Sequence, residues 1–122
     1  AVSQMDRLDI TAIMEGEEYV EEMLDIFIED TTEELSGMRD AFFMRNYVKL
    51  GSIIHKAAPL WEMIRINIPR SELKGMASMP PEKWGGISDE RIEKLIEAVE
   101  QAVEKAKKIK EKTYGNRIGS GR

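Results

Sequence analysis

The spacing of apolar residues is the feature that most restricts how this chain can fold. Between residues 17 and 43, apolar side chains recur every three or four positions with Asp and Glu between them, as in a helix with one buried stripe. The stripe comprises Val20, Met23, Leu24, Phe27, Ile28, Thr31, Leu35 and Met38. No segment alternates as a half-buried strand does, so we predict an all-α protein.

A second long helix is predicted directly after the first. The side chain of Asn46 can accept hydrogen bonds from the free amides of a first helical turn. The apolar phase then continues over residues 47–66. Pro69 ends this stretch, because the residue before a proline disfavours the α conformation.

Capping residues predict two more helices. Ser71 is expected to cap a short helix over 72–78, and Ser88, followed by two acids, is expected to start a last helix that reaches about residue 112. Each amphipathic helix must bury its stripe against the others. We therefore predict an antiparallel up-and-down four-helix bundle, with a short extra N-terminal helix over 9–14.

The length of 122 residues suits one domain. We assign residues 1–114 to the bundle and 115–122 to a flexible tail. The first residue is not Met and no signal peptide is recognisable, so we interpret the chain as a fragment of a larger protein.

Composition excludes several functions. The absence of cysteine rules out thiolate metal sites and cysteine nucleophiles. A net charge of −5 argues against nucleic acid as a partner. No apolar run is long enough to span a bilayer, so we expect no membrane contact by this fragment.

The single histidine, His55, points away from the apolar stripe of its helix. At about 100° per residue, the apolar side chains gather on the opposite side, namely Leu50, Ile53, Ala57, Leu60, Trp61 and Ile64. Residues three and four positions away on a helix surround a side chain, and here they are small or compact: Gly51, Ser52, Ala58 and Pro59. We therefore expect these four residues to form a shallow surface patch around the imidazole that a second protein can approach closely. An exposed imidazole can act as a nucleophile near neutral pH. A solvent-exposed histidine without a function is the alternative.

Pro59 lies four residues after His55, so its ring opposes the His55 carbonyl and removes one helical hydrogen bond. The helix either ends there or kinks and continues. We favour a kink, because the apolar phase continues through Leu60, Trp61 and Ile64.

Residues 53–64, with the sequence IIHKAAPLWEMI, resemble the phosphoacceptor helix of histidine-containing phosphotransfer domains, as found at the C-terminal end of hybrid sensor histidine kinases. Phe27, Leu35, Met38 and Asn46 stand at the family's usual separations from the histidine, and the resemblance covers roughly residues 8–106. The usual lysine and glycine, three and four positions after the histidine, are replaced here by Ala58 and Pro59. A subset of these domains has a similar His-Lys-x-x-Pro form.

The resemblance implies that His55 is the phosphorylated residue and that the domain carries phosphoryl groups without catalysing the reaction alone. Response-regulator receiver domains, in the same parent chain or separate, would supply the aspartate and Mg²⁺, and the fragment itself would hold no cofactor. The resemblance implies that the parent is a hybrid sensor kinase, a class that can be anchored in the inner membrane, with this domain in the cytoplasm. The docking patch would comprise Val48, Ser52, Lys56, Pro59, Glu62 and Met63.

Three alternatives stay open at this point. The chain could be a helical interaction module whose acidic first helix binds a basic partner, or a phosphotransfer-like domain that is no longer phosphorylated. Carboxylates of the first helix could also hold a metal, namely Glu18, Glu21, Glu22 and Asp25. That helix lacks the Glu-x-x-His pairs of di-iron bundles, which disfavours the metal site.

Overall fold

The computed structural model describes the backbone of residues 18–119 and the side chains of residues 20–113. Within this part the chain forms four α-helices and one 3-10 helix and no strand. In order they are α2 (Glu18–Phe43), α3 (Tyr47–Met63), α4 (Arg70–Ala77), η1 (Pro81–Gly86) and α5 (Asp89–Gly119). The prediction of an all-α protein is confirmed, and the N-terminal helix expected over 9–14 lies outside the described residues.

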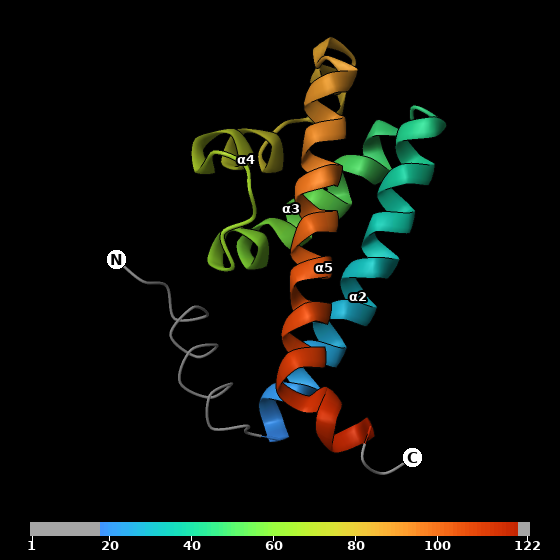
Figure 1. Ribbon diagram of the computed structural model, residues 1–122. Helices are drawn as coiled ribbons and strands as arrows, with labels where there is room; N and C mark the ends of the chain where they lie inside the picture. Colours follow the sequence, from blue (N-terminus) through green and yellow to red (C-terminus); the bar gives the residue numbers. More distant parts are fainter. Residues whose placement is uncertain (1–17, 120–122) are drawn as a thin grey trace.

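The helices pack as a bundle around one main core (Figure 1). The two longest helices, α2 and α5, lie side by side and run in opposite directions. Helix α3 returns from the end of α2 and crosses obliquely behind α5, and α4 and η1 pack on α3. Because α4 has only eight residues, the strict up-and-down arrangement of four helices stays a prediction.

Most of the stripe predicted for α2 is indeed inside the bundle. Five of its eight members are buried and two are half-buried. Met23 is the exception, with 39% of its surface exposed, because it lies about 60° around the helix from Val20 and falls at the edge of the stripe.

Two residues after the last residue of α2 and of α3 stands an arginine with left-handed backbone, Arg45 (φ 56°) and Arg65 (φ 57°). In each case the next amide reaches back to a carbonyl five residues earlier: Asn46 to Ala41 at 2.7 Å and Ile66 to Trp61 at 3.2 Å. This is the Schellman arrangement, which usually uses glycine. Without a glycine signal, the sequence placed the end of α3 three residues too late.

The start of α4 and the end of α5 also differ from the prediction. Helix α4 begins at Arg70 after Pro69, and no side chain caps it, so Ser71 is not its cap. Helix α5 continues to Gly119, beyond the end that we expected near residue 112, and the flexibility expected for residues 115–122 stays a prediction. A single glycine at 115 costs only about 1 kcal/mol in a helix and need not end it.

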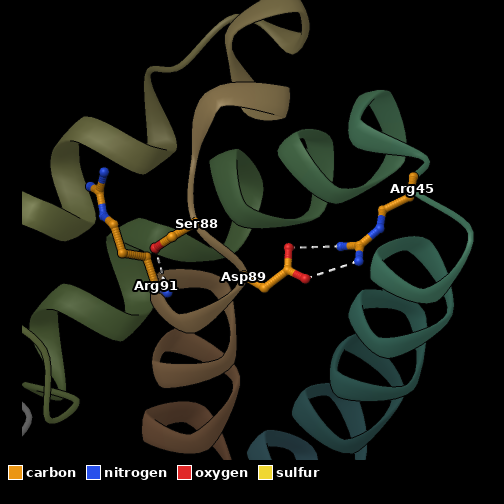
Figure 2. A network of polar contacts seen from close by, with 4 residues as sticks. All are labelled: Arg45, Ser88, Asp89 and Arg91. Atoms are coloured by element: carbon orange, nitrogen blue, oxygen red, sulfur yellow. Dashed lines mark hydrogen bonds and ion pairs between the residues drawn. The ribbon is translucent and has the colours of Figure 1, made fainter.

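Both predicted N-terminal caps, Asn46 and Ser88, are confirmed. The Asn46 side chain accepts from the amide of Lys49 at 3.2 Å, and the Ser88 hydroxyl accepts from the amide of Arg91 at 3.4 Å (Figure 2).

The same end of the bundle carries a two-pronged ion pair (Figure 2). The guanidinium of Arg45 donates to both carboxylate oxygens of Asp89, at 3.0 and 2.9 Å. These hydrogen bonds raise the pKa of Arg45 further above its ordinary value. The pair joins the α2–α3 turn to the first turn of α5.

Among the described helices, none is both long enough and apolar enough to cross a membrane.

Candidate functional site

The side chain of His55 is exposed, and one of its ring nitrogens is engaged. Nδ1 lies 2.9 Å from the backbone oxygen of Ala77, the last residue of α4. A carbonyl oxygen can only accept a hydrogen bond, so Nδ1 carries the proton. The other nitrogen, Nε2, then holds the free lone pair of the neutral ring. This hydrogen bond orients the imidazole and favours the tautomer with the proton on Nδ1.

A shallow groove of about 500 Å³ runs beside the imidazole. One wall comes from α3 and the other from the connection between α4 and η1. The lining residues are Val48, Gly51, Ser52 and His55 on α3, and Ala77, Ser78, Met79 and Pro81 opposite them. The structure therefore brings three sequence-predicted residues, Val48, Gly51 and Ser52, together with His55.

Gly51 also has a role that the sequence did not suggest. We expected it to leave room for a partner protein. A Cβ added at Gly51 would lie 3.1 Å from Nε1 of Trp84, closer than nearly all side chains tolerate. Gly51 is small because the indole of η1, which is fully buried, packs directly on α3 at this position.

Ala58 does not belong to the exposed surface around His55. It is 5% exposed and part of the main core. Ala58 lies on the side of α3 that is covered by neighbouring elements, and wheel angles within one helix cannot reveal such coverage. Pro59 is exposed, and α3 continues past it to Met63, which confirms a proline within a continuing helix.

Glu62 and Met63 lie in a second hollow, at the turn between α3 and α4. This hollow, of about 490 Å³, is also lined by Pro59, Trp61, Ile68 and Arg70. The Glu62 carboxylate accepts from Nε of Arg70 at 2.5 Å and lies 3.9 Å from Nζ of Lys74. The patch predicted from the sequence is thus divided, since Glu62 and Met63 do not line the groove of His55.

The charges near His55 on its own helix are positive. Between residues 41 and 61 the chain contains Arg45, Lys49 and Lys56 but no Asp or Glu. Lys49 and Lys56 are exposed, and both lie about 100–120° from His55 on the same flank of α3. Lys56 forms no ion pair with the described part of the chain.

Sequence reasoning missed the wall of the groove opposite α3. The run Met79-Pro80-Pro81 indicated a loop but not its position. Ala77 is 22 residues from His55, and its contribution is a backbone carbonyl, which leaves no trace in side-chain composition.

Among the residues that the structure describes, no group of three or more His, Cys, Asp or Glu side chains could hold a metal ion. The chain matches no family model, no curated protein and no solved structure.

Proposed function

We propose that this chain is a histidine phosphotransfer domain, in which Nε2 of His55 takes a phosphoryl group from the aspartate of one receiver domain and gives it to another. The observation that carries the proposal is the state of the imidazole. The ring is exposed, its Nδ1 proton is held by the Ala77 carbonyl at 2.9 Å, and Nε2 is left as the nucleophilic atom.

The transfer step balances without a catalytic group from this chain. The Nε2 lone pair attacks the phosphorus of an aspartyl phosphate, the new N–P bond forms, and the P–O bond to the carboxylate breaks. The proton stays on Nδ1, so the ring becomes a cation that donates to Ala77. A loose phosphoryl transition state chiefly requires in-line access and charge neutralisation, and the receiver's Mg²⁺ would supply the latter. With this reaction we propose a cytoplasmic location for the domain, as part of a signalling kinase.

The surroundings of His55 support docking of such a partner. The groove is open, and exposed Val48 lies within about 20° of His55 on the helical wheel. The positive flank formed by Lys49 and Lys56 suits the carboxylate-rich site of a receiver, because opposite charges speed encounter. We propose that Lys56 helps to attract the phosphoryl group, which its side chain would approach from one flank of α3.

The test is transfer from a phosphorylated receiver domain with Mg²⁺, with receivers from any parent chain included in the panel. Wild-type protein should gain one acid-labile phosphate, measured by intact mass. His55→Gln should gain none, and Lys105→Gln, on the exposed side of α5, should behave as wild type. Circular dichroism must show equal helix content in all three. Label on His55→Gln, or no label from any receiver on the panel, would contradict the proposal.

A helical interaction module without phosphotransfer is the second candidate. Three large apolar side chains are mostly exposed at the α2–α3 turn: Phe43 (84%), Met44 (71%) and Val48 (66%). Such patches are common where proteins bind one another. If a receiver binds wild type and His55→Gln equally but transfers phosphate to neither, this second candidate replaces the first.

A further inference from the structure

We propose that Trp84 is a positioning residue for His55, which acts through the α4–η1 connection to fix the imidazole in the tautomer that leaves Nε2 free. The inference rests on the proposed function for its significance, because a fixed tautomer matters when His55 is a nucleophile. The contacts that carry it belong to η1 and α4 rather than to the helix that bears the histidine.

The acceptor of the His55 proton is a backbone atom at the end of a short helix. Ala77 is the last residue of α4, and the α4 helix spans only eight residues. Its last carbonyls have no partner within the helix, so the Ala77 oxygen is available to Nδ1. Its position therefore depends on how firmly the following residues are held against α3.

Trp84 holds the residues that follow Ala77 against α3. Its indole is fully buried, and Nε1 donates to the backbone oxygen of Met79 at 3.3 Å, two residues after Ala77. The same ring packs on α3 at Gly51, where a Cβ would approach Nε1 to 3.1 Å. One side chain thus contacts both the helix that carries His55 and the segment that carries its acceptor.

Gly51, the residue of α3 against which Trp84 packs, lies one helical turn from His55. Gly51 precedes His55 by four residues, so the two lie on neighbouring turns of the same side of α3. Both line the groove, together with Ala77 and Met79. A shift of the indole by a few tenths of an ångström would therefore alter the hydrogen bond of the ring and the shape of the groove together.

The tautomer determines which ring nitrogen of His55 becomes phosphorylated. With Nδ1 protonated and bound, phosphate can bond only to Nε2 of the neutral ring. If Ala77 moves away, the proton can occupy either nitrogen, and Nδ1 becomes an alternative nucleophile. A net hydrogen bond of ordinary strength favours one tautomer by roughly two- to tenfold.

The experiment measures the tautomer of His55 without any phosphotransfer. Two-bond proton–nitrogen correlation spectra of ¹⁵N-histidine-labelled protein, recorded above neutral pH, distinguish a protonated from an unprotonated ring nitrogen. The chain has a single histidine, so assignment is direct. Wild type should show the proton on Nδ1. Trp84→Phe, which keeps a ring but lacks the N–H group, and Gly51→Ala, which crowds the indole, should each shift the population towards Nε2–H by about two- to tenfold.

Two glycine variants serve as matched controls. Gly75→Ala places a Cβ in open space on α4, and Gly37→Ala crowds the side chain of Ile53 to 3.1 Å without touching η1. Both should keep the wild-type tautomer. Phosphorus NMR of the phosphorylated proteins should then show Nδ1-phosphohistidine only in Trp84→Phe and Gly51→Ala.

Two results overturn the inference. One is a wild-type spectrum in which the Nδ1–H tautomer is not the major form, since Ala77 would then not hold the proton. The other is an unchanged spectrum in Trp84→Phe and Gly51→Ala when both are folded. Neither result depends on transfer, so failure of the tautomer test and failure of the proposed function can be told apart.

Discussion

The two halves of α3 meet the rest of the bundle in different ways. Around His55, the helix presents Val48 and Ser52 to solvent, and its neighbours on α4 and η1 leave a groove. Beyond Pro59, Trp61 is fully buried and Glu62 is paired with Arg70 and Lys74. One amphipathic sequence therefore gives a first half that borders the groove of His55, which we call the open half, and a second half whose hollow contains the Glu62 ion pairs, which we call the closed half.

The comparison extends to the two tryptophans. Trp84 of η1 packs on the first half of α3 at Gly51, and Trp61 belongs to the second half of α3. Both indoles are fully buried. Nε1 of Trp84 donates to Met79, whereas Nε1 of Trp61 has no partner in the described part of the chain. A buried, unpaired N–H group costs about 1–3 kcal/mol. Burial alone thus says little about what each tryptophan contributes to the free energy of unfolding.

The largest expected difference concerns these two rings. Trp84→Phe removes ring volume and leaves the Met79 carbonyl without its donor. Trp61→Phe removes similar volume but also removes an unpaired N–H group. We expect Trp84→Phe to lower the free energy of unfolding by about 1–3 kcal/mol more than Trp61→Phe does, measured by urea denaturation followed by circular dichroism. Equal losses would show that the indole hydrogen bond does not distinguish the two halves.

The next comparison concerns docking at the two exposed apolar residues of α3. Val48→Ser should reduce kcat/KM for phosphoryl transfer from a receiver by roughly three- to tenfold, because apolar area that the partner would cover is lost. Met63→Ser, in the closed half, should change it less than twofold, within about 0.4 kcal/mol. A larger effect at Met63 would move the docking surface towards the α3–α4 turn.

A smaller effect is expected at Glu62. Its partners Arg70 and Lys74 are largely exposed, so Glu62→Gln should lower the free energy of unfolding by less than about 1 kcal/mol. High salt should shrink the difference. Transfer to His55 should not change. A loss of transfer would mean that the closed half takes part in the reaction after all.

Glu34 on α2 lies outside both halves of α3 and serves as a control position. Burial, then the charges of Asp30 and Glu33, raise its pKa above the ordinary value of 4.5. The folded state therefore binds this proton more tightly than the unfolded chain, and stability falls as pH rises from 4.5 through the raised pKa. Glu34→Gln should remove that fall and stabilise the protein at neutral pH by less than about 1 kcal/mol, with no gain in acid. Denaturation of both proteins across this range tests the sign, and transfer by Glu34→Gln should equal wild type.

Several features of the fold could be predicted from the sequence. The stripe of α2, the caps Asn46 and Ser88, and the continuation of α3 past Pro59 all follow from periodicity and local hydrogen bonding. The end of α3 was predicted less well, because Arg65 adopts the left-handed conformation where glycine is the usual signal. The outward direction of His55 was also predictable, since it depends only on the phase of one helix.

The rest of the site required the tertiary structure. A helical wheel gives the direction of a side chain but not which neighbouring element covers that direction, so Ala58 was expected at the surface and is buried. Gly51 lines the groove beside His55, and only the structure shows that Trp84 also packs against it. The sequence by itself determined a helical protein with one exposed imidazole. Only the packing of α4 and η1 on α3 decided which ring nitrogen is free, because that choice is made by a backbone oxygen 22 residues away.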